Sequence, residues 1–179
     1  MTRTALIVID IQNGMFGGAP LPALHEAESL LSNTSALLAA GRKAGLSIIY
    51  IQHCAYPGQV LIEGTEAWAI HSDIAPMKED IVVLKKASSA FEETELHAVL
   101  KKKGIDTIIS CGLQSEHCVT NTSISALELG FTVIVAKDCH STFPTEDLSA
   151  STIVAQQNEF LETKGATVLP VSEIIKLEL

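Results

Sequence analysis

The sequence predicts a doubly wound α/β fold, with a mainly parallel six-stranded sheet in the order 3-2-1-4-5-6 and helices on both faces. Strand-like and helix-like segments alternate along the 179 residues, which is the pattern of strands joined by crossover helices. The strand-like segments are apolar throughout rather than alternating, which indicates that both faces of the sheet are covered. The length suits a single domain spanning residues 1–179.

Each predicted element follows from a local pattern. The strands are short apolar runs at residues 4–9, 46–52, 81–84, 107–111, 131–136 and 166–171. The helices have apolar residues at helical spacing and are closed in four cases by a glycine: residues 21–43, 93–103, 115–129, 146–163 and 172–177. Residues 54–79 interrupt this alternation with glycines and prolines. Such an excursion is often functional, although it can also be a surface crossover.

The composition excludes several classes of partner. The formal net charge of -9 argues against binding to nucleic acid or to an anionic membrane, because both attract basic surfaces. No apolar stretch is long enough to span a bilayer, and the first apolar run is too short for a secretion signal. The four cysteines contain no CxxC spacing. We therefore expect a cytoplasmic protein with reduced thiols and a small-molecule substrate.

Cys118 lies in the most informative segment. The strand at residues 107–111 ends at Gly112, and the helix that follows begins at Ser115 or Glu116, so Cys118 falls in its first turn. The unpaired N–H groups and the dipole of a helix N-terminus favour a thiolate, and we expect this thiol to ionise more easily than a free one. A thiolate suits covalent catalysis. The alternative is that Cys118 is a small buried apolar residue.

Polar residues follow several predicted strands at their carboxyl ends, where ligands bind in this class of fold. With strands 1 and 4 adjacent, Asp10 and Cys118 face each other, and a lysine reaches them from two strands away, about 10 Å. Asp10 then serves as general base, and the lysine stabilises both anions. Alternatively, Asp10 caps a turn and one of the lysines is simply solvated. The residues concerned are Asp10, Gln12, Gln52, His53, Lys85, Lys86, Asp138 and His140.

Five segments in this order resemble the isochorismatase-like cysteine hydrolases, a family that includes nicotinamidases and N-carbamoyl amidohydrolases. They are Ala5–Asn13, which is similar to the opening strand and base, Gly64–Pro76, Lys85–Leu96, the nucleophile segment Gly112–Val119, and Asp138. Any one of these matches is a modest signal, but their order across nearly the whole chain makes the resemblance specific.

The resemblance implies a catalytic triad of Asp10, Lys85 and Cys118. Lys85 is chosen over Lys86 because the lysine of the family precedes the phenylalanine of its motif, here Phe91, by six positions.

The resemblance also implies a non-proline cis peptide between Leu113 and Gln114. Its role would be to direct the Gln114 N–H, together with that of Cys118, at the oxyanion of a tetrahedral intermediate.

The sequence departs from the family at the metal site. Nicotinamidases of this family bind a metal through an Asp-x-His pair after the second strand and a further histidine, whereas Ile51, Gln52 and His53 stand here. His53 and His71 without a carboxylate form an incomplete metal site. We therefore expect neither a metal nor another cofactor.

The remaining expectations concern the pocket and the assembly. Gln12, His53, Trp68 and Phe91 are candidates for substrate binding, although Trp68 and Phe91 alternatively pack in the core or on another subunit. Specificity would come from residues 54–79 and from the loop after Asp138. The resemblance implies a homo-oligomer, either a dimer or a tetramer.

Three functions fit these observations. The favoured one is a metal-independent amidohydrolase that cleaves a small amide, carbamoyl or lactam-like C–N bond through a thioester on Cys118. The second is vinyl-ether hydrolysis of the isochorismatase type, which uses Asp10 and does not need the cysteine. The third is a non-catalytic binding or redox-sensing module that uses the thiol.

Overall fold

The computed structural model describes residues 3–18 and 20–177 and contains the predicted sheet, with strand order β3-β2-β1-β4-β5-β6 and parallel pairing throughout. The strands are β1 (Thr4–Ile9), β2 (Ser47–His53), β3 (Ile81–Lys85), β4 (Thr107–Leu113), β5 (Thr132–Ser141) and β6 (Thr167–Leu169). The α-helices are α1 (Ala27–Lys43), α2 (Leu96–Lys103), α3 (Thr120–Glu128), α4 (Ala150–Thr163) and α5 (Val171–Ile174). Three short turns complete the described elements: the 3-10 turns η1 (Asn13–Met15) and η2 (Ser72–Ile74), and the π-helical turn η3 (Ser115–Val119).

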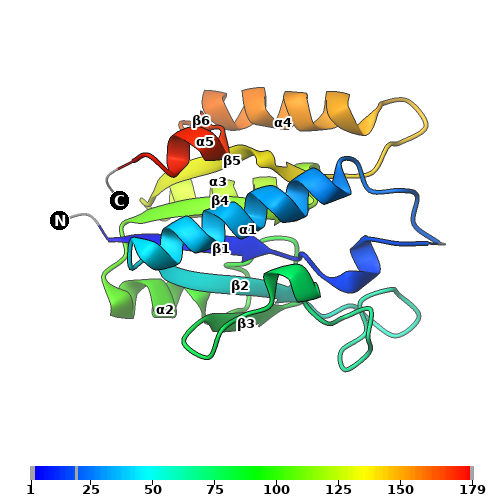
Figure 1. Cartoon of the computed structure of the whole chain (residues 1–179), viewed down its shortest axis with the longest axis horizontal. Helices are drawn as coiled ribbons and strands as arrows, with labels where there is room; N and C mark the ends of the chain where they lie inside the picture. The colour runs from blue at the N-terminus through cyan, green and yellow to red at the C-terminus, as the bar shows by residue number, and fades with distance from the viewer. Residues whose placement is uncertain (1–2, 19, 178–179) are drawn as a thin grey trace.

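The helices form a layer on each face of the sheet. Figure 1 shows α1 lying across one face, with α5 beside it, while α2 and α3 lie behind the strands. Among the described residues, no helix has both the length and the apolar character needed to cross a membrane.

The central strand β1 explains why the strand-like segments are apolar throughout. Leu6 and Val8 pack in the core on the α1 side, whereas Ile7 and Ile9 pack in the core on the α2 side, and all four are at most 1% exposed. Burial of each such side chain stabilises the fold by roughly 1.5–3 kcal/mol. Covering both faces in this way is what a parallel sheet requires.

Apart from the segment that carries Cys118, three helices begin later than the sequence pattern predicts. The first begins at Ala27 rather than at residue 21, because Pro22 disfavours helical geometry at Leu21 and the N-cap residue Glu26 has a left-handed φ of 46°. The second begins at Leu96 rather than at residue 93, because Glu93 has a left-handed φ of 52°. The fourth begins at Ala150 rather than at residue 146, because the Ser149 side chain caps it by accepting a hydrogen bond from the Thr152 N–H.

The segment that carries Cys118 was predicted to be one helix over residues 115–129 and is instead two elements. The π-helical turn Ser115–Val119 precedes α3, and the Thr120 hydroxyl donates to the Ser115 carbonyl at 2.7 Å across that turn. Single π-helical turns occur frequently at functional sites, where they displace the register of the side chains.

Gly112 allows β4 to approach the end of β1. Its φ is +125°, and a Cβ atom on it would lie 2.8 Å from both the backbone nitrogen and the carbonyl carbon of Ile9, and closer still to the Ile9 oxygen. Gly112 pairs with Ile9, the residue before Asp10, so this contact sets where the nucleophile segment leaves the sheet. Only glycine fits both the conformation and the space.

We predict that Gly112→Ala lowers the free energy of unfolding by at least about 3 kcal/mol, because the new methyl group meets backbone rather than a movable side chain. Gly130→Ala is the matched control: its φ is +87°, but nothing lies near its Cβ position, so it should cost only about 1–2 kcal/mol. Urea denaturation measures both, and equal losses would contradict the steric argument.

Candidate active site

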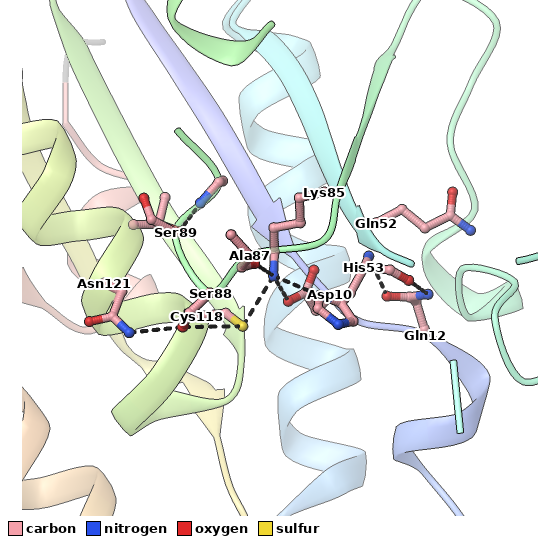
Figure 2. Close-up of polar contacts among 12 residues, drawn as sticks. Asp10, Gln12, Gln52, His53, Lys85, Ala87, Ser88, Ser89, Cys118 and Asn121 are labelled. Carbon is pink, nitrogen blue, oxygen red and sulfur yellow. Dashed lines mark hydrogen bonds and ion pairs between the residues drawn. The ribbon is translucent and has the colours of Figure 1, made fainter. Parts of the chain in front are cut away.

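The carboxyl edge of the sheet brings together the three residues of the predicted triad. Asp10 follows β1, Lys85 is the last residue of β3, and Cys118 lies in the turn after β4 (Figure 2). The Lys85 Nζ lies 2.7 Å from Asp10 Oδ2 and 3.1 Å from Cys118 Sγ. The negative charge of Asp10 also acts on the Cys118 thiol and raises its pKa. The three groups can therefore act on one reacting carbonyl.

Lys85 is a buried, fully paired cation. It is 2% exposed, and its Nζ lies within 3.2 Å of four groups: the Asp10 carboxylate, the Cys118 sulfur, the Ala87 carbonyl and the His53 Nδ1. The neighbouring Lys86 is exposed. The lysine that faces the thiol is therefore the one that the resemblance implied.

The environment raises the pKa of both members of the ion pair. Burial raises the pKa of Asp10 above its usual 3.8, and attraction to Lys85 only partly opposes this rise. Burial lowers the pKa of Lys85, but the charge of Asp10 and the contact with Cys118 outweigh it, so the net pKa is raised above 10.5. A carboxylate with a raised pKa is a better proton acceptor near neutral pH.

The expectation that Cys118 ionises easily is wrong for the resting site. Burial and the adjacent negative charge of Asp10 raise the pKa of the Cys118 thiol to about 11, although Lys85 opposes the rise. The helix-terminus argument failed because it considered only the local backbone, whereas these larger effects come from other strands. The resting thiol is protonated, so it needs a base at the moment of reaction.

Gln12 holds the end of β2 in place. It is fully buried; its Nε2 donates to the carbonyls of His53 and Trp68, and its Oε1 accepts the His53 N–H (Figure 2). The polar atoms of Gln12 are thus already engaged with the backbone. We assign Gln12 a positioning role rather than the substrate contact expected from the sequence.

His53 lies between Gln12, which holds the end of β2, and Lys85. Its Nδ1 lies 3.2 Å from the Lys85 Nζ, and burial, followed by the charge of Lys85, lowers its pKa. Lys85 can only donate in this contact, so we assign the proton of the neutral ring to Nε2.

A cavity of about 250 Å³ opens over the thiol. This volume is below the roughly 300–1,000 Å³ typical of ligand sites, so a small molecule or part of a larger one fits. Its polar lining is Asp10, His53, Gln59, Gln114 and Cys118. Its apolar lining is Met15, Leu21, Ala55, Val60, Leu61, Leu113 and Phe143.

The two aromatic candidates from the sequence do not line this cavity. Trp68 supplies its carbonyl oxygen to Gln12 and Gln52, and its indole nitrogen is buried. Phe91 stacks on Phe131 with ring centres 6.0 Å apart, on the face covered by α2 and α3. Phe91 therefore packs in the core, which was the alternative expected for it.

Several lining residues were missed by sequence reasoning. Leu21 and Phe143 lie outside the helices and strands of the structure, and Met15 ends the 3-10 turn η1. Phe143 had one usable signal, since it closely follows the carboxyl end of β5. Residues 54–79 contribute Val60 and Leu61, as expected for that excursion.

A hydroxyl on the far side of the sulfur was also missed. The Ser88 Oγ lies 3.9 Å from Cys118 Sγ and accepts a hydrogen bond of 2.8 Å from the Asn121 side chain. Because Asn121 occupies the hydroxyl as an acceptor, the Ser88 proton is directed toward the sulfur. Ser88 thus gives the sulfur a second, weaker donor besides Lys85.

The peptide bond between Leu113 and Gln114 is cis, and both residues line the cavity. The turn that follows is held by a buried chain of side chains. His140 contacts the Ser115 hydroxyl at 2.8 Å through Nδ1 and the Asn158 oxygen at 2.9 Å through Nε2. Burial lowers the pKa of His140, so it remains neutral in this network.

The two histidines considered for a metal are engaged elsewhere. The Nδ1 of His53 faces Lys85, and that of His71 accepts the Asp73 N–H while its ring packs on Phe16. Across residues 3–18 and 20–177, the structure contains no group of three or more His, Cys, Asp or Glu side chains arranged to hold a metal ion.

A larger hollow of about 390 Å³ lies at the opposite edge of the sheet, beside Arg3, Ser47 and Lys103. Its lining contains no thiol, carboxylate or imidazole. The candidate active site is therefore the smaller cavity over Cys118, where the reactive groups converge.

This fold and site have known relatives. The isochorismatase domain model matches residues 4–169, and the chain belongs to the isochorismatase-like hydrolase family. The structure superimposes on N-carbamoylsarcosine amidase from Thermoplasma acidophilum with a TM-score of 0.81 and 26% identity, covering 95% of this chain and 97% of that one.

Curated relatives include further hydrolases. A streptothricin hydrolase of Streptomyces noursei is 37% identical over 139 residues, which is 78% of this chain but 50% of that protein. Maleamate amidohydrolase of Pseudomonas putida is 28% identical over 153 residues, covering 76% of this chain and 71% of that protein. This chain thus spans about half the length of the streptothricin hydrolase that it matches.

We predict that iodoacetamide labels Cys118 before the other cysteines, and that the labelling rate rises with pH until about 11. Cys118 is labelled first because the other three thiols are at most 4% exposed. The rate depends on pH because Cys118 reacts as the thiolate and not as the thiol. Mass spectrometry of samples quenched between pH 7 and 11.5 gives the profile. Cys118→Ala is the control, and a plateau reached below pH 9 would contradict the raised pKa.

Proposed function

We propose that this protein is a cysteine-dependent amidohydrolase that cleaves the C–N bond of a small amide, carbamoyl or lactam-like substrate. The observation that carries the proposal is the contact of one buried lysine with both a carboxylate and a thiol beneath a small cavity. A thiol supplies the nucleophile, and the carboxylate supplies the base that a protonated thiol needs. The amidohydrolases among its relatives support the same reaction class.

The first half of the proposed reaction forms a thioester. Asp10 accepts the proton of Cys118 while the sulfur attacks the carbonyl carbon of the substrate. The resulting oxyanion accepts hydrogen bonds from the N–H groups of Gln114 and Cys118. The C–N bond then breaks, and the leaving nitrogen takes the proton back from Asp10.

The second half regenerates the thiol. Asp10 accepts a proton from water as the water oxygen attacks the thioester carbon. The C–S bond breaks, the acid is released, and the proton on Asp10 returns to the sulfur of Cys118. Lys85 remains protonated throughout and stabilises whichever partner, Asp10 or Cys118, carries the negative charge.

The presence and placement of Cys118 favour this reaction over vinyl-ether hydrolysis. A reaction that relies on Asp10 alone does not use the sulfur, and so does not account for its contacts with Lys85 and Ser88.

A panel of primary amides, carbamoyl compounds and lactams tests the proposal. It includes maleamate, N-carbamoylsarcosine and streptothricin, and release of ammonia or of a new amine identifies the substrates.

We predict that Cys118→Ala lowers kcat/KM by at least about 10⁴-fold on any substrate found, and that Asp10→Asn lowers it by about 10³-fold. Lys86→Met is the matched control, because it removes an exposed lysine next to Lys85 and should retain full activity. Circular dichroism verifies the fold of each variant. Turnover by Cys118→Ala at the wild-type rate would exclude the thioester route.

We predict that kcat/KM rises with pH through an apparent pKa above 3.8, the ordinary value for aspartate. The sign follows from the role of Asp10: its protonated form cannot accept the thiol proton, and burial extends that form to higher pH. Lys85 keeps its charge beyond pH 10.5. Deprotonation of Lys85 should therefore cause no loss of activity at any pH up to that value. The residual kcat/KM of Asp10→Asn should lack this rise at acidic pH. If the rise persists in the variant, it belongs to the titration of another group.

A further inference from the structure

We infer that the cavity over Cys118 selects amides whose remaining part is small, apolar and uncharged, and that it discriminates against substrates bearing a carboxylate. The inference rests on the proposed function and specifies its substrate class. It comes from the distribution of charge around the cavity rather than from the reacting groups alone.

The wall of the cavity has no cation for a carboxylate. Among the described residues, the lining contains neither lysine nor arginine, and seven of its twelve members are apolar. Val60 and Leu61 come from the excursion after β2, whereas Leu21 precedes α1 and Phe143 follows β5. An ionised carboxylate placed against such a wall loses its water without gaining an oppositely charged partner.

Lys85, which lies beneath the cavity, cannot serve as that partner. An ammonium group has three N–H donors, whereas the Nζ of Lys85 already has four neighbours within 3.2 Å. To bind a substrate carboxylate, Lys85 would have to release Asp10 or Cys118. Either release disrupts the pair on which the proposed chemistry depends.

The carboxylate of Asp10 adds direct repulsion. One of its oxygens is paired with Lys85, while Oδ1 is buried and has no hydrogen-bond partner among the described residues. Asp10 lines the cavity, so an anionic group there meets an oxygen that already carries negative charge. Juxtaposed like charges of this kind strongly disfavour the wrong partner.

A matched pair of primary amides tests the inference: succinamate, which carries a carboxylate, and its methyl ester, which has the same chain without the charge. We expect kcat/KM, measured by ammonia release, to be about 100-fold higher for the ester. Protection of Cys118 from iodoacetamide gives a second readout that does not require turnover. The ester should protect the thiol at lower concentration than succinamate does.

Val60→Lys introduces the missing cation at the wall and should raise kcat/KM for succinamate by at least about tenfold while lowering it for the ester. Val60→Met is the matched control for side-chain length. Val82→Lys adds the same charge at an exposed position of β3 outside the cavity and should change neither value.

The outcomes separate this inference from the proposed function. If succinamate is turned over as fast as its methyl ester or faster, or protects Cys118 as well or better, the inferred substrate class is overturned. The amidohydrolase proposal is left intact by that result. Failure of both compounds to protect Cys118 at 100 mM also overturns the inferred substrate class. If Cys118→Ala still releases ammonia from the amide group of the methyl ester, the proposed function is refuted instead.

Discussion

The buried ion pair of Lys85 with Asp10 is the interaction on which the rest of the site depends. Moving either charge alone out of water is strongly unfavourable, so each residue is retained in the interior only by the other. The remaining N–H groups of Lys85 are shared among the Ala87 carbonyl, the sulfur of Cys118 and the Nδ1 of His53. The pair therefore fixes both the charge of the carboxylate and its position beside the thiol, and loss of either partner disturbs the electrostatics of all three residues.

The sheet makes this pair geometrically feasible. Parallel strands place their carboxyl ends at one edge, and the order β3-β2-β1-β4 lets Lys85 reach across β2 to the end of β1. Asp10 leaves β1 with a φ of 51°, a left-handed conformation that aspartate tolerates better than most residues. Gly112 lets β4 close on Ile9, so the nucleophile segment departs beside that carboxylate. The chemistry thus depends on two backbone positions that carry no reactive group.

The features that depend on local sequence pattern were predicted, whereas those that depend on the tertiary packing of distant segments were missed. The apolar runs were sufficient to predict the six strands, the doubly wound fold class supplied their order, and the resemblance distinguished Lys85 from Lys86. The start of α1 was missed because helical periodicity does not show that Glu26 adopts a left-handed φ of 46°. The contribution of Phe143 to the cavity depends on the path of an irregular loop. The ionisation of Cys118 was predicted with the wrong sign, because burial and the charge of Asp10 exist only in the folded chain.

A thiol with a pKa of about 11 is compatible with nucleophilic catalysis because of where the charge goes. Burial raises the pKa of both Cys118 and Asp10, so the cost of moving a proton between them depends on the difference between the two values rather than on either one. Before transfer, the negative charge lies on Asp10; after transfer, it lies on the sulfur. Lys85 sits 2.7 Å from the first and 3.1 Å from the second, so it faces an anion in both states. The net charge of the pocket stays constant, and its low-dielectric interior never has to accommodate an unpaired ion.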